Sequence, residues 1–109
     1  MSGSGGGGIT IIPDDSPCEG FRARTRLVSP VPEVVEKLSQ GDYLRIERVQ
    51  QGGFDALTAF RGEEMAGNLT MTEFVRMSEC MLAGYSFYAV VRRIDGGHVT
   101  LDVLQGSCP

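Results

Sequence analysis

The sequence predicts a mainly β protein of the α+β class: a small antiparallel barrel, or a strongly curved sheet, that carries two helices. Short segments in which apolar and polar residues alternate, as they do in β-strands, recur along most of the chain. Glycine-containing turns such as "QQGG" and "DGG" separate several of these segments, as expected for hairpins. Only two segments have the apolar spacing of a helix, which is too few for a doubly wound parallel sheet.

The chain of 109 residues is expected to form one domain with one hydrophobic core. Residues 1–8 are glycine and serine after Met1, so we expect a flexible tail there and a single globular domain over residues 9–109. Three isoleucines follow the tail in the segment "ITII", residues 9–12. We expect this small apolar patch to lie against the domain or against a partner.

The clearest strand is residues 21–28, "FRARTRLV", where charged and uncharged residues alternate. The uncharged residues face one side of the strand: Phe21, Ala23, Thr25 and Leu27. The arginines face the other side: Arg22, Arg24 and Arg26. A short helix is predicted next, over residues 29–41, with Pro32 in its first turn and Gly41 as its stop. Its buried side carries Val34, Val35 and Leu38.

Two strands follow at residues 42–49 and 54–60, and a further turn and strand are predicted within residues 61–70. In this last stretch Gly62 supplies a tight turn, and Gly67 permits a bulge or a close approach of another backbone segment. Structural turns account for these glycines better than a phosphate-binding loop does, because neither common glycine-rich phosphate motif is present.

A second helix is predicted over residues 70–85, starting near Thr72 and Glu73 and ending at Gly84. Five apolar residues recur on it at helical spacing: Phe74, Val75, Met77, Met81 and Leu82. Two strands, residues 85–94 and 98–105, complete the chain around the "DGG" turn.

The three cysteines, an odd number, argue against a disulfide framework in a chain with no secretory signal pattern. Cys80 is interpreted as a small core residue, whereas Cys18 and Cys108 meet only if the two ends of the fold are adjacent. Without a CxxC pair, and with His98 as the only histidine, we expect neither a metal site nor a cofactor. No catalytic motif is present, so we expect a protein that is not an enzyme.

The net charge of −4 and the pI near 4.9 lean against a dedicated nucleic-acid binder, although a local basic patch is enough to attract phosphates. No apolar run approaches the roughly 18 to 20 residues of a membrane-spanning helix. We therefore expect a cytoplasmic protein that does not enter a membrane.

Several stretches resemble the HIRAN domain family in residues 21 to about 104. The matching residues are Gly41, Asp42, Leu44 and Ile46 of the second strand, Ala56 or Ala59 of the third, and Gly62, Gly67 and Leu69 of the following turn and strand. The resemblance implies an OB-like barrel that binds the ends of single-stranded DNA. The chain is also similar to small bacterial proteins with glycine-rich N-termini, a likeness that implies no function.

The arginine row, Arg22, Arg24 and Arg26, is the main candidate site, with its members about 6.6 Å apart along one strand. Such a row predicts a groove for single-stranded nucleic acid, which Arg45 joins if its strand pairs with the first, and where Tyr43 can stack on a base. One alternative is a solvated face whose arginines pair with acids such as Glu47. The competing function is protein–protein interaction or assembly through "ITII", an exposed sheet edge or the tail.

Overall fold

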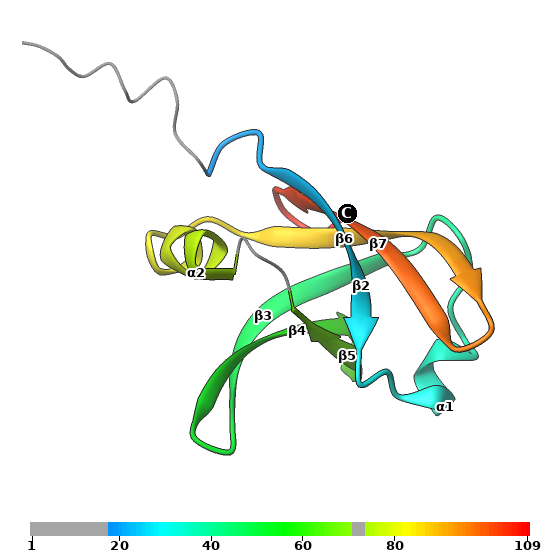
Figure 1. Cartoon of the computed structure of the whole chain (residues 1–109). Helices are drawn as coiled ribbons and strands as arrows, with labels where there is room; N and C mark the ends of the chain where they lie inside the picture. The colour runs from blue at the N-terminus through cyan, green and yellow to red at the C-terminus, as the bar shows by residue number, and fades with distance from the viewer. Residues whose placement is uncertain (1–17, 71–73) are drawn as a thin grey trace, which may run out of the picture.

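The computed structural model describes residues 18–70 and 74–109, which contain six antiparallel strands closed into a barrel (Figure 1). Around the barrel the strands follow the order β2-β5-β4-β3-β6-β7. The strands are β2 (Arg22–Val28), β3 (Tyr43–Gln51), β4 (Phe54–Arg61), β5 (Glu64–Leu69), β6 (Phe87–Asp95) and β7 (His98–Gln105). The predicted mainly β class with two helices is confirmed, and the fold is the barrel rather than the open curved sheet.

The barrel interior is filled by apolar side chains from alternate positions of the strands, as strand geometry requires. The most deeply buried of these are Leu44, Leu57, Ala59, Phe87, Ala89, Val91, Val99, Leu101 and Val103. The opposite face of each strand points outward and carries most of the exposed side chains, although Thr58 and Asp102 are buried on it. The predicted strand faces therefore indicate which side chains lie on the outside of the barrel.

The glycines of the tight turns behave as the sequence predicts. Gly52 and Gly53 close the β3–β4 hairpin, and Gly62 closes the next one, all three with positive φ. A side chain at Gly67 would place its Cβ 3.2 Å from the Cα of Pro30, so the segment after β2 passes directly over β5 at this point. The pairing of β4 with β5 also shifts register here, which confirms the expected bulge and close approach.

The first helix is shorter than the predicted range of residues 29–41, because α1 covers only Pro32–Val35. After Val35 the backbone amides of Lys37 and Leu38 donate to carbonyls three residues earlier, so the α-helical bonding pattern is not continued. The buried side is nevertheless as expected, since Val34, Val35 and Leu38 all lie in the core.

The second helix, α2 (Phe74–Leu82), lies on the opposite side of the barrel from α1 in Figure 1. Its predicted start at Thr72 and Glu73 falls outside the described residues. Of the apolar residues that recur at helical spacing, Met77 is completely buried, whereas Val75 and Leu82 are 64% and 72% exposed. The helix turns only a narrow side to the core, centred on Met77 and Cys80. Val75 and Leu82 lie outside this narrow side.

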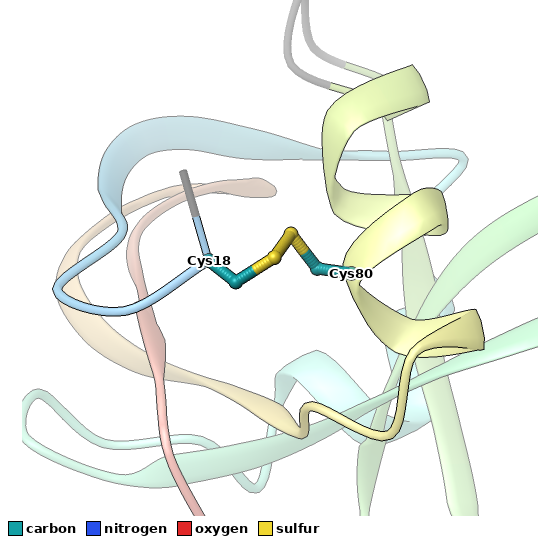
Figure 2. Close-up of a disulfide and its surroundings, with 2 residues drawn as sticks. All are labelled: Cys18 and Cys80. Atoms are coloured by element: carbon teal, nitrogen blue, oxygen red, sulfur yellow. A yellow bond between two sulfur atoms is a disulfide. The ribbon is translucent and has the colours of Figure 1, made fainter. Parts of the chain in front are cut away.

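A disulfide joins Cys18, just before β2, to Cys80 on α2 (Figure 2). The expectation of no disulfide and the possible meeting of Cys18 with Cys108 are therefore wrong. Cys80 lies in the core as expected, but it also forms this disulfide. The fold brings α2 beside the start of β2, so that the Cα atoms of Cys18 and Cys80 are 5.6 Å apart. Cys108 is an exposed free cysteine. The predicted tail and the "ITII" patch lie outside the described residues.

Candidate nucleic-acid interface

The outer surface of β2, β7 and β6 carries the predicted arginine row. In the pairing of β2 with β7, Arg22 lies opposite Leu104, Arg24 opposite Asp102 and Arg26 opposite Thr100. All three arginines are exposed, whereas Phe21 and Leu27 are buried, so the predicted alternation of β2 is confirmed. The row faces solvent along the barrel wall.

Asp102 is the centre of this surface, although its side chain is only 5% exposed. Its Oδ1 accepts a hydrogen bond from Arg24 Nε at 2.8 Å, and its Oδ2 accepts a longer one from Arg24 Nη2 at 3.3 Å. Arg92 on β6 donates from Nε to Oδ2 at 2.7 Å, and Arg22 Nη2 lies 3.7 Å from the same oxygen. One carboxylate therefore holds guanidinium groups from both neighbouring strands.

These contacts keep Asp102 ionised. The hydrogen bond from Arg24 is the largest cause that lowers the pKa of Asp102 to about 2, with Arg92 adding to it and burial opposing it. The same pairing raises the pKa of the Arg24 guanidinium. At neutral pH the site thus contains a fixed negative charge that orients positive ones.

Positive charge is nevertheless in excess. We call the surface formed by Arg22, Arg24, Arg26, Arg92 and Asp102 the arginine face. Four guanidinium groups and one carboxylate leave a surplus of three positive charges on it. Within the described part of the chain, Arg26 makes no ion pair at all. A chain with a net charge of −4 therefore presents a locally basic surface.

Arg45 does not extend the row in the predicted way, because β3 pairs with β4 and β6 and not with β2. The Arg45 side chain bonds to Glu47 and donates to the Gly62 carbonyl at 2.8 Å. It also lies over the ring of Phe60, 5.0 Å from its centroid. Arg45 thus matches the alternative interpretation, in which a strand arginine pairs with a neighbouring acid.

Tyr43, on the same strand as Arg45, lies near the arginine face. Tyr43 is opposite Val90 in the ladder of β3 and β6, and Val90 is opposite Asp102 in the ladder of β6 and β7. Tyr43 is 49% exposed, and its ring meets the ring of Tyr88 edge to face, with 5.8 Å between the ring centroids. Two aromatic rings therefore border the arginine face on the side away from β2.

Sequence reasoning missed Asp102 as a member of the site. The available signal was a single acid in the outward register of an otherwise apolar last strand, "HVTLDVLQ". A lone acid at such a position has cations for neighbours only if the strand order places them there. That order depends on barrel closure, which alternation within one segment does not reveal.

Other kinds of site find less support in the described residues. No group of three or more histidine, cysteine or acidic side chains there is arranged to hold a metal ion. His98 is exposed at the start of β7. None of the helices in the described ranges is long and apolar enough to cross a membrane.

No protein-family model matches the chain, and no curated protein matches it in sequence. The structure is similar to a crystal structure of a protein from Lactobacillus plantarum that was solved as a structural genomics target. The TM-score is 0.63 at 15% sequence identity, over 79% of this chain and 99% of the other. At this identity the likeness shows the fold alone: the chain shares a small β-barrel with an uncharacterised bacterial protein.

Proposed function

We propose that the protein is a non-catalytic binding module that takes single-stranded nucleic acid on the arginine face. The observation that carries this proposal is the surplus of positive charge around Asp102 on an otherwise acidic protein. Acids on the same or a neighbouring strand can balance the cations of a charged strand surface, as Glu47 does for Arg45. Among the described residues of the arginine face, one carboxylate pairs with three arginines and Arg26 has no ion pair, so positive charge remains available to an anion.

The arrangement also suits a strand of phosphates. Alternate residues of β2 are about 6.6 Å apart, close to the spacing of phosphates along an extended single strand. Asp102 fixes Arg24 and Arg92 in position, so less side-chain entropy is lost when an anion binds them.

The aromatic side chains give the bases a place on the same surface. Tyr88 and Tyr43 lie on β6 and β3, two and three strands away from β2, or about 10 and 14 Å around the barrel. A strand whose phosphates follow β2 therefore directs its bases across β7 toward these rings, on which bases of any sequence can stack. The resemblance to HIRAN domains supports the same class of ligand.

Protein–protein interaction is the second candidate, and one observation favours it. Val75 and Leu82 are seven residues apart on α2, lie on one side of the helix, and are largely exposed. The sheet-edge form of this hypothesis loses support, because the six described strands close into a barrel, although β2 pairs with β5 only at Leu27 and Val28. The "ITII" and tail forms concern residues outside the described ranges.

Fluorescence anisotropy of a labelled single-stranded oligonucleotide, titrated with the full chain at low and at physiological salt, tests the proposal. We expect saturable binding that weakens as salt rises, because phosphate contacts release counterions. Binding through the apolar side of α2 would respond little to salt. No saturable binding even at low salt would refute the proposal and direct attention to protein partners.

A further inference from the structure

A hollow of about 570 Å³ opens on the arginine face where β2 ends. Its lining consists of Arg24, Thr25, Arg26, Val28, Thr70 and Thr100. None of these residues is acidic, and all but Val28 carry a side-chain hydrogen-bond donor. The composition therefore suits a small anion with several oxygen atoms.

The hollow forms because β2 changes its neighbour. The residues from Arg22 to Arg26 pair with β7, whereas Leu27 and Val28 pair with β5. On the β5 side the rim is held by the Thr25 hydroxyl, which donates to the Thr70 carbonyl at 3.4 Å. On the β7 side Thr100 stands directly opposite Arg26. The rim thus consists of backbone and short side chains that the barrel itself positions.

The two arginines of the hollow differ in whether their charge and hydrogen-bond donors are already used within the protein. Arg24 is already committed to Asp102 through two hydrogen bonds, so much of its charge is compensated. Arg26 is exposed and has no ion pair within the described residues, so its guanidinium fork remains for a ligand. Opposite residues of antiparallel strands have Cβ atoms about 5 Å apart, which puts the Thr100 hydroxyl within reach of the same ligand.

We propose that this hollow is a subsite for one phosphate group, held by Arg26 and assisted by the hydroxyls of Thr70 and Thr100. A guanidinium binds two oxygens of a phosphate at once, and short hydroxyls supply further donors. If the bound phosphate belongs to a nucleic-acid strand, this inference rests on the proposed function. Inorganic phosphate or a free phosphate monoester offers the same chemistry.

The first test uses inorganic phosphate on the isotope-labelled full chain, with sodium chloride of equal ionic strength as the reference. We expect saturable NMR shifts at the Arg26 side-chain N–H and at the backbone amides of Thr70 and Thr100. Arg26→Gln should remove them. Arg61→Gln, which deletes an exposed arginine of β4 paired with Glu64, should leave them in place. Unsaturable shifts, or shifts that survive Arg26→Gln, would overturn the subsite.

The second test repeats the titration with a single-stranded oligonucleotide and separates the subsite from the proposed function. If Arg26→Gln weakens binding by about tenfold or more and Arg22→Gln by clearly less, the hollow holds a strand phosphate. If both variants weaken it equally, the subsite is wrong and the proposed function stands. If phosphate binds at Arg26 but the oligonucleotide does not bind at all, the subsite stands for free phosphates and the proposed function is wrong.

Discussion

Two regions of the barrel contain arginines, and they balance them differently. In the region of β3, β4 and β5 each arginine pairs with a different acid: Arg45 with Glu47, Arg48 with Asp55 and Arg61 with Glu64, which also accepts a hydrogen bond from Lys37. On the arginine face three arginines share one buried carboxylate, and a fourth has no ion pair among the described residues. The number of arginines is similar, but only on the arginine face do the arginines outnumber the acids they pair with.

The comparison shows that the number of neighbouring acids decides whether the charge of an arginine is neutralised or remains available to a ligand. A matched pair on the surface neutralises itself and contributes little to stability. A shared, buried carboxylate instead orients several guanidinium groups without cancelling them. The predictions below pair a change on the arginine face with a matched change in the region of β3, β4 and β5.

The largest expected effect is on nucleic-acid affinity. Arg26→Glu and Arg61→Glu make the same change in net charge, but only the first reverses an unpaired cation of the arginine face. Because charge-assisted hydrogen bonds contribute about 1.5 to 3 kcal/mol, we expect Arg26→Glu to weaken oligonucleotide binding by about 10- to 100-fold. Arg61→Glu should change it less than about twofold, as expected for a distant, screened charge. Similar losses of anisotropy signal in both variants would mean that overall charge, and not the arginine face, governs binding.

The next effect is on stability. Asp102→Asn leaves the half-exposed guanidinium groups of Arg24 and Arg92 facing a neutral amide, and we expect it to lower the free energy of unfolding by about 2 kcal/mol. Glu47→Gln removes the acid of an exposed pair and should cost less than about 1 kcal/mol. Urea unfolding of both variants measures the difference. Equal costs would show that burial gives Asp102 no special role.

Lowering the pH should remove the stability that ionised Asp102 gives to the fold, over a defined range of pH. The pKa of Asp102 is about 2 in the folded chain, below its ordinary value of 3.8. A lowered pKa stabilises the fold above the unfolded value, and this stabilisation is lost as the pH falls from about 4 to about 2. The shift corresponds to a stabilisation on the order of 2 kcal/mol. Unfolding at a series of pH values should show the gap between the parent and Asp102→Asn closing over this range. A gap that persists at pH 2 would contradict the ion-pair explanation.

The smallest effect expected is in the salt dependence. Three surplus charges that each neutralise a phosphate give a log–log slope of affinity against salt of roughly −2 on single strands. Arg26→Gln should reduce it to roughly −1.4, whereas Arg48→Gln should leave it unchanged. Anisotropy titrations at four or five salt concentrations resolve this difference. An unchanged slope in Arg26→Gln would place the phosphate contacts elsewhere.

The order of the elements and the outward direction of the arginine row were predictable from the sequence, because both follow from alternation within a single segment. The partners of those arginines were not. Arg45 was expected to join Arg22, Arg24 and Arg26 if their strands paired, but the barrel order places β7 and β6 between β2 and β3. The same limit hid Asp102, whose burial comes from arginines of two other strands, and the disulfide, whose cysteines are 62 residues apart.

That disulfide has a consequence for the shape of the chain when it is not folded. The bond between Cys18 and Cys80 encloses α1 and all of β2, β3, β4 and β5 in one covalent loop. An oxidised chain in denaturant is therefore a closed loop with a linear segment on each side of it. It should have a smaller hydrodynamic radius than the fully linear reduced chain. It should migrate faster on a denaturing gel without reductant than with it. Since such bonds persist mainly in oxidising compartments, the fraction of fast-migrating chain recovered from cells would report directly on where the protein resides.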